Sequence, residues 1–174
     1  GRGRRCRQAP PHAPMGYGVA DTGVDFEFVS VKDAHGLLKS DKAILVDARD
    51  TDDFKRSKIQ TSYSFPANDI IFRPDSLDKT LVSRCKGLTE AGKVVICFSD
   101  IGISGMQNRG HVSRCRHVAQ YLHEMGVPRD GIRRLQGGLN AWKRLGLDGV
   151  LGDRRRYWAG VIMSSAKERE VDAY

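Results

Sequence analysis

The sequence contains no apolar run approaching the roughly 20 residues of a membrane-spanning helix, so we expect no membrane span. Its four cysteines form no Cys-x-x-Cys pair and show no Cys/His spacing typical of zinc. We therefore expect no metal, no cofactor, and a reducing, intracellular compartment. Aromatic residues make up only 7% of the chain and do not interleave with the basic ones, so we expect no nucleic-acid surface. The cysteines are Cys6, Cys85, Cys97 and Cys115.

Acidic residues are missing from the start of the chain, where the first is Asp21. Four arginines among the first seven residues carry half of the net charge of +8, which leaves about +4 (8 − 4) for the remainder. Residues 1–20 are rich in Arg, Gly and Pro, which predicts a disordered basic tail. The chain begins with Gly, and its start resembles the remainder of a transit peptide, which would indicate a mitochondrion or plastid. A solvated tail of a cytoplasmic protein is the alternative.

The body of the chain alternates predicted strands with predicted helices. Ser30 is a suitable N-cap for a helix over residues 31–39, and residues 43–47 form a continuous apolar strand. Residues 132–135 form the last strand of the same kind. This alternation predicts an α/β fold with a mainly parallel central sheet flanked by helices. We expect one domain over residues 21–149 and a C-terminal extension over residues 150–174.

The stretch from Lys93 to Gln120 is the most informative part of the chain. Residues 94–96 form a β-branched strand that ends in Cys97, and a Gly- and Ser-rich segment follows. An apolar stripe then predicts a helix that includes Cys115. A thiol between a strand and a helix start can have its pKa lowered from about 8.5 to roughly 3.5–7.5. The alternative is a buried cysteine that only packs.

Four motifs in order give the chain a resemblance to the rhodanese-homology domain. They are Ile44–Arg49, a hydrophobic strand followed by Asp-x-Arg; Asp53–Pro66; Val94–Cys97; and Leu135–Trp142, with its Gly-Gly and Trp. The resemblance covers roughly Phe26 to Gly146. It implies a rhodanese-like three-layer α/β sandwich whose cysteine carries a persulfide, taking sulfur from a small donor and passing it to a thiophilic acceptor.

The resemblance also implies roles for individual residues. Cys97 would be the catalytic nucleophile. The expected anion-binding groups are the backbone from Phe98 onward, the Ser99 hydroxyl and a nearby arginine. The expected structural support comes from the aspartate and the arginine of the Asp-x-Arg motif. By number, the anion-binding residues are Phe98, Ser99, Arg109 and Gly110, with Arg114 as a further cation, and the supporting residues are Asp47 and Arg49.

The segment after the cysteine departs from the pattern of the family's phosphatase-like members. Those members have Arg after five intervening residues, whereas that position is Ile103 here. The first arginine is Arg109, twelve positions on (109 − 97 = 12), so residues 100–108 resemble an insertion. Asp100 would repel a thiolate or a bound anion.

Three functions follow from this pattern. The first is a sulfurtransferase of the thiosulfate or 3-mercaptopyruvate type that uses Cys97. The second is an inactive rhodanese-like module that binds a protein partner through the inserted loop or the C-terminal extension. The third is a Cys-based phosphatase or arsenate-reductase-like enzyme, in which Arg109 and Gly110 fold back to the cysteine.

Overall fold

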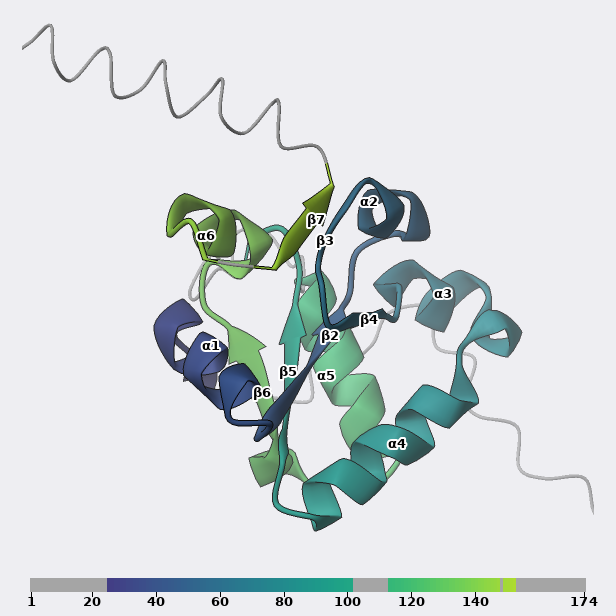
Figure 1. Ribbon diagram of the computed structural model, residues 1–174. Helices are drawn as coiled ribbons and strands as arrows, with labels where there is room; N and C mark the ends of the chain where they lie inside the picture. Colours follow the sequence, from purple (N-terminus) through teal and green to yellow (C-terminus); the bar gives the residue numbers. More distant parts are fainter. Residues whose placement is uncertain (1–24, 102–112, 148, 153–174) are drawn as a thin grey trace, which may run out of the picture.

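The computed structural model describes residues 25–101, 113–147 and 149–152 (Figure 1). Helices and strands alternate along most of this range. The strands are β1 Phe28–Val29, β2 Ala43–Asp47, β3 Ser57–Ile59, β4 Ser62–Ser64, β5 Val94–Phe98, β6 Ile132–Leu135 and β7 Val150–Gly152. The helices are α1 Val31–Lys39, α2 Thr51–Arg56, α3 Ala67–Phe72, α4 Lys79–Glu90, α5 Arg114–Glu124 and α6 Gly138–Arg144, with short 3-10 turns at Pro74–Ser76 and Arg129–Gly131.

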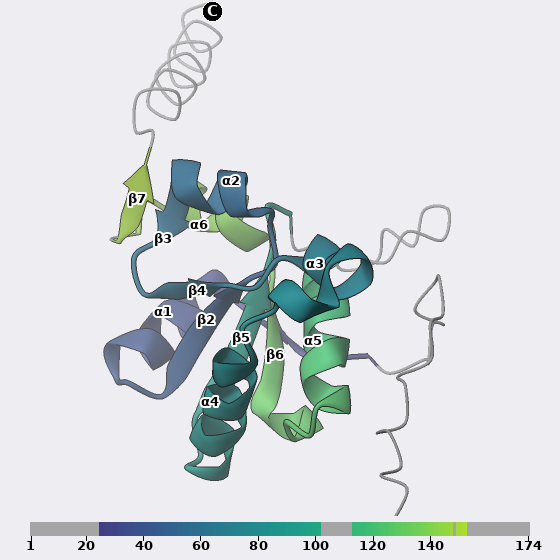
Figure 2. The same ribbon diagram turned by 90° about the vertical axis from the view of Figure 1, so that its right-hand side faces the viewer.

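The central sheet has five strands in the order β1-β6-β5-β2-β4, and all of its pairings are parallel. Strand β5 lies in the middle, and the helices cover the sheet on both faces (Figures 1 and 2). The predicted α/β fold with a parallel sheet is therefore confirmed. A parallel sheet brings the carboxyl ends of its strands to one edge, where ligand sites of such folds are built.

Local sequence signals explain several of these elements. The Ser30 hydroxyl accepts a hydrogen bond from the Asp33 N–H at 3.1 Å and so caps α1, which confirms the predicted N-cap and helix. Strands β2 and β6 have the predicted bounds, 43–47 and 132–135. Because helices cover both faces of the sheet, β2 can be apolar from Ala43 to Val46, before it ends in Asp47.

Alternation along β5 divides the core into two halves. Val95 and Cys97 belong to the half that packs against α4 and α5, whereas Ile96 and Phe98 belong to the half beneath α1 and α6. All four side chains are fully buried. Successive strand residues point to opposite faces, so a shift of one residue within β5 would exchange the two environments.

Strand β7 extends the folded unit beyond the boundary expected at residue 149. Residues 150–152 pair antiparallel with β3, in the register Ile59↔Val150 to Ser57↔Gly152. The Gln60 N–H also donates to the Gly149 carbonyl at 2.5 Å. An extension that lies outside this pairing therefore begins at residue 153 or later.

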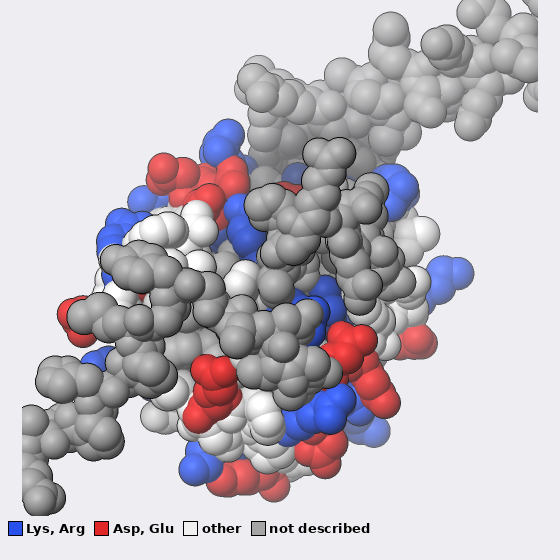
Figure 3. All heavy atoms as spheres, turned by 180° about the vertical axis from the view of Figure 1, so that it is seen from behind, with Lys and Arg blue, Asp and Glu red and all other residues white. Residues whose placement is uncertain are grey.

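Other expectations concern the ends of the chain and its surface. The predicted tail, residues 1–20, lies outside the described residues. Within the described ranges, no helix is long and apolar enough to cross a membrane. Figure 3 shows the molecule from behind, and basic and acidic side chains are interspersed on the described part of that face.

Gly137 precedes α6 with a φ of +73°, and an added Cβ would lie 2.5 Å from the Ala141 Cβ. Gly146 follows α6 with a φ of +61°, but an added Cβ there would meet no atom within 4 Å. Gly146→Ala should cost about 1 kcal/mol of unfolding free energy through backbone strain alone. Gly137→Ala should cost about 1–3 kcal/mol more because of the clash. Urea unfolding of both variants measures the difference, and equal losses would contradict the steric argument.

Candidate active site

A buried ion pair occupies the carboxyl end of β2. The Arg49 guanidinium donates to both carboxylate oxygens of Asp47, with the shortest N–O distance at 2.7 Å, and the Arg49 backbone N–H donates to the same carboxylate at 3.0 Å. Their side chains are 4% and 0% exposed. Burial acts to lower the pKa of Arg49, but the hydrogen bonds and charges of Asp47 and Asp100 outweigh it and the net shift is upward. The guanidinium therefore stays charged.

The ion pair is the centre of a larger charged network. Arg49 also reaches Asp100 at 3.4 Å, and Asp100 accepts from Arg114 at 2.9 Å. Arg114, the first residue of α5, lies 3.4 Å from Asp50 as well. Two arginines thus face three aspartates among the described residues. Both Arg49 and Arg114 are therefore paired with carboxylates, and both lie against Asp100, whose negative charge they compensate.

The chain after β5 is fastened to its neighbours through carbonyl groups. The Phe98 carbonyl accepts from the Ala48 N–H at 2.8 Å. The next two carbonyls accept from the first turn of α6, Ser99 from the Leu139 N–H at 2.9 Å and Asp100 from the Asn140 N–H at 3.0 Å. The Ser99 hydroxyl, predicted to bind an anion, donates to the Ile101 carbonyl at 3.3 Å, and its predicted role stays untested.

The position of Cys97 differs from the one expected at a strand-to-loop turn. Cys97 lies within β5, which continues through Phe98, and its side chain is fully buried. Burial raises the pKa of the Cys97 thiol well above its usual range, and the charges of Cys115 and Cys85 raise it further; among the described residues, Arg134 acts to lower it. Two interpretations were open for this cysteine, a thiol with a lowered pKa and a buried cysteine that packs. The direction of the shift agrees with the second, because tertiary packing encloses the residue that the sequence pattern placed at a turn.

One row of side chains crosses the sheet on the face covered by α5. Its members are Cα partners in successive strand pairs: Phe28 with Arg134, Arg134 with Cys97, and Cys97 with Val46. Paired positions of a sheet share a face, so Arg134 is the immediate neighbour of Cys97. Sequence reasoning missed Arg134. Its place in the strand could have indicated it, because Arg134 is the third residue of β6 and the bounds of β6 were predicted correctly.

The remaining predicted site residues, Arg109 and Gly110, lie outside the described residues. The described site therefore joins Asp47, Arg49, Asp100, Arg114 and Asp50 in one charged network, and Cys97 lies beside Arg134 on the neighbouring strand.

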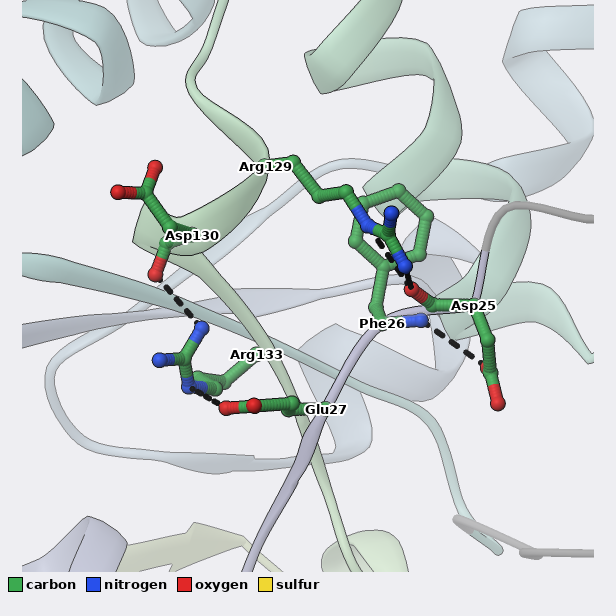
Figure 4. Close-up of a pocket in the computed structure, with 6 residues that line it drawn as sticks. All are labelled: Asp25, Phe26, Glu27, Arg129, Asp130 and Arg133. Carbon is green, nitrogen blue, oxygen red and sulfur yellow. Dashed lines mark hydrogen bonds and ion pairs between the residues drawn. The ribbon is translucent and has the colours of Figure 1, made fainter.

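A pocket of about 360 Å³ lies elsewhere, beside the amino-terminal ends of β1 and β6 (Figure 4). Its charged groups bond to one another: Arg133 contacts Glu27 at 3.1 Å and the Asp130 carbonyl at 2.6 Å, and Arg129 donates to the Asp25 carbonyl at 2.7 Å. None of the three cysteines of the core lines it. We assign no chemistry to this pocket.

The fold and the buried cysteine together define an α/β domain with a thiol in its central strand. A family model described as a rhodanese-like domain matches residues 30–145, more than half of the chain. The chain therefore belongs to the rhodanese-like domain family.

Three solved structures are similar in fold. The first is Ygr203w, described as a yeast protein tyrosine phosphatase of the rhodanese family; it is 18% identical, with 78% of this chain and 98% of that chain covered and a TM-score of 0.57. The BH2092 protein of Bacillus halodurans is 21% identical, with 73% and 77% covered and a TM-score of 0.51. A thiosulfate sulfurtransferase from Pseudomonas aeruginosa is 19% identical, with 74% and 20% covered and a TM-score of 0.50.

These identities support the fold and do not select an activity. The comparison with curated proteins finds no match.

Arg49→Met should lower the unfolding free energy by about 3–5 kcal/mol, because it leaves the buried Asp47 carboxylate without its cation. Arg56→Met is the matched control, since Arg56 pairs with Asp53 while its own side chain is 73% exposed. That exposed pair should contribute less than about 1 kcal/mol. Denaturant unfolding of both variants provides the comparison, and similar losses would show that burial does not govern the strength of the pair.

Proposed function

We propose that the protein is a rhodanese-like sulfurtransferase that carries sulfane sulfur as a persulfide on Cys97. The observation that carries the proposal is the position of Cys97, next to the carboxyl end of the central parallel strand and beside the cation of Arg134. Membership of the rhodanese-like domain family supports the same chemistry. Asp47 and Arg49 would support the site by holding the ends of β2 and β5 in place without touching the sulfur.

The proposed reaction with thiosulfate has two displacement steps. The Cys97 thiol first loses its proton to buffer, because only the thiolate is nucleophilic. The thiolate attacks the outer sulfur of thiosulfate, a new S–S bond forms, and sulfite leaves with the electrons of the broken S–S bond. A thiophilic acceptor such as cyanide then attacks the outer persulfide sulfur, and thiocyanate leaves while the Cys97 thiolate is restored. Charge and sulfur balance in both steps.

The sequence favours sulfur transfer over phosphatase chemistry. A phosphate ester requires a cradle for three oxyanion oxygens, to which an arginine normally contributes as a bidentate donor. Ile103 replaces that arginine, and Arg114 is already paired with Asp100 and Asp50. Sulfane sulfur transfer requires a thiolate and one anionic sulfur to be stabilised, which is a smaller demand. The phosphatase alternative depends on Arg109.

One observation favours a second candidate, a binding module without catalytic activity. Cys97 is fully enclosed, and its pKa is raised well above the usual range, chiefly by burial. In that case a protein partner would bind to the segment after Asp100 or to the extension after residue 152. A deletion that tests the extension should therefore begin at residue 153, so that the β3–β7 pairing is kept.

Intact-mass spectrometry after incubation with thiosulfate or 3-mercaptopyruvate tests the proposed carrier. The native chain should gain the mass of one sulfur atom, and Cys97→Ser should not. Cys85→Ser is the matched control, because Cys85 is an equally buried thiol of the same half of the core, and it should keep the adduct. If the native chain gains no sulfur, or if Cys97→Ser gains as much, the sulfurtransferase proposal is wrong and the binding module is favoured.

Sulfur uptake should depend steeply on pH. Because the pKa of Cys97 is raised above its usual range, chiefly by burial, the thiol is almost entirely protonated at pH 7. Below that pKa the thiolate fraction, and with it the rate of uptake, should rise about tenfold for each pH unit. Single-turnover sulfur uptake measured between pH 7 and 10 provides the profile. A rate that is already at its plateau near pH 7 would contradict the assigned direction of the shift.

A further inference from the structure

A cation that stabilises a charged sulfur must lie close to it and must not be fully neutralised by other groups. Ile103 stands where phosphatase-like members of the family have an arginine, Arg109 lies outside the described residues, and Arg49 and Arg114 belong to the aspartate network. Arg134 differs from both. It is the Cα partner of Cys97 across the β5–β6 ladder.

The guanidinium of Arg134 is held in place on the face covered by α5. One terminal nitrogen donates to the Ser113 hydroxyl, the N-cap residue of α5, at 2.7 Å. The guanidinium carbon lies 4.4 Å from the centre of the Phe28 ring. Ser113 also lies 3.5 Å from the Cys115 sulfur, which belongs to the same half of the core as Cys97. These contacts direct the side chain over the row that contains Cys97.

The charge of Arg134 is only partly compensated. Its side chain is 6% exposed, and the carboxylate paired with it in the described part of the chain, that of Asp25, is 3.6 Å away and 76% exposed. Among the described residues, the buried Nε has no hydrogen-bond partner. A buried guanidinium with an unsatisfied donor is costly, so a further anion at this position would be stabilised.

We propose that Arg134 is a positioning residue with a charge-holding role: its guanidinium stabilises the negative charge on the sulfur of Cys97, in both the thiolate and the persulfide. This rests on the proposed function only as far as the persulfide is concerned. Arg134 would act on the sulfur through its charge, and its donation to Ser113 would fix the distance between α5 and the site. The substrate class that fits is a small anionic sulfur donor.

The groups around Cys97 act in opposite directions. Cys115 on α5 and Cys85 on α4 oppose its ionisation, and Val46 on β2 is apolar. Arg134 on β6 is the group that favours the anion among the described residues that influence Cys97. Removal of its charge should therefore leave burial and like charges unopposed.

Arg134→Met tests the proposal in the full chain, because it keeps the length of the side chain and removes the charge. The readout is the rate at which iodoacetamide, an uncharged reagent, alkylates Cys97 between pH 8 and 10, measured for each cysteine peptide by mass spectrometry. Cys97 should react about tenfold more slowly at a given pH, which corresponds to a pKa about one unit higher. Arg134→Lys should retain most of the native rate.

Cys85 provides an internal control in the same samples. Its pKa is raised to about 11, chiefly by burial, and the opposing cation is Arg84. If Arg134 were only structural, its replacement would loosen the core and accelerate alkylation of both thiols. The charge-holding role instead predicts a slower Cys97 and an unchanged Cys85. Faster alkylation of both thiols, or an unchanged Cys97 profile, would overturn the proposal.

Asp25→Asn tests the same idea with the opposite sign and does not alter the core. Removal of this exposed carboxylate should strengthen the effect of Arg134 and accelerate alkylation of Cys97 about twofold. If Arg134→Met does not fold, an unchanged rate in Asp25→Asn overturns the proposal. A native Cys97 that stays unmodified at pH 10 while Cys85 reacts overturns it as well.

Sulfur uptake separates this proposal from the proposed function. If the native chain forms no persulfide but Arg134→Met still slows alkylation of Cys97, the charge-holding role stands and the sulfurtransferase proposal fails. If the native chain takes up sulfur and Arg134→Met does so at the same rate, the role of Arg134 fails and the proposed function stands.

Discussion

The burial of the Asp47 carboxylate is the constraint on which the arrangement of the site depends. A carboxylate without solvent contact persists as an anion only when donors surround it. Arg49 provides these donors from its side chain and its backbone, and its remaining groups reach the Ser57 carbonyl at 2.5 Å and Asp100 at 3.4 Å. One buried charge therefore fixes the ends of β2 and β5 and the start of β3 relative to one another.

The same low-dielectric surroundings act differently on Cys97, which lies one pair away from Asp47 along the β2–β5 ladder. Phe98 pairs with Asp47 and Cys97 pairs with Val46, so the thiol lies on the opposite face from the aspartate and receives none of its donors. Among the described residues Arg134 is the group that favours its anion, and burial outweighs it, so the net shift of the Cys97 pKa is upward. A persulfide is more acidic than a thiol. In the proposed sulfurtransferase, the persulfide on Cys97 would therefore ionise more readily in these surroundings than the empty thiol.

Sequence patterns predicted the elements that local chemistry decides. Ser30 capped its helix and residues 43–47 formed their strand because capping geometry and apolar runs act within a few residues. The pattern misplaced the end of β5, because Phe98 continues the strand through a hydrogen bond from Ala48, a contact between segments distant in the chain. Residues 150–152 were assigned to an extension, because a three-residue strand that contains glycine carries almost no periodic signal.

Site residues that belong to a sequence motif could be predicted, whereas a residue that reaches the site through the register of strand pairing could not. Asp47, Arg49 and Cys97 belong to recognisable motifs. Arg133 and Arg134 stand side by side in a strand, and alternation sends Arg133 toward Glu27 near the surface and Arg134 into the core. A methionine of similar length would fill the volume of Arg134 without its desolvation cost. Packing alone therefore does not require a charge at this position, whereas the proposed stabilisation of an anion on the neighbouring sulfur does.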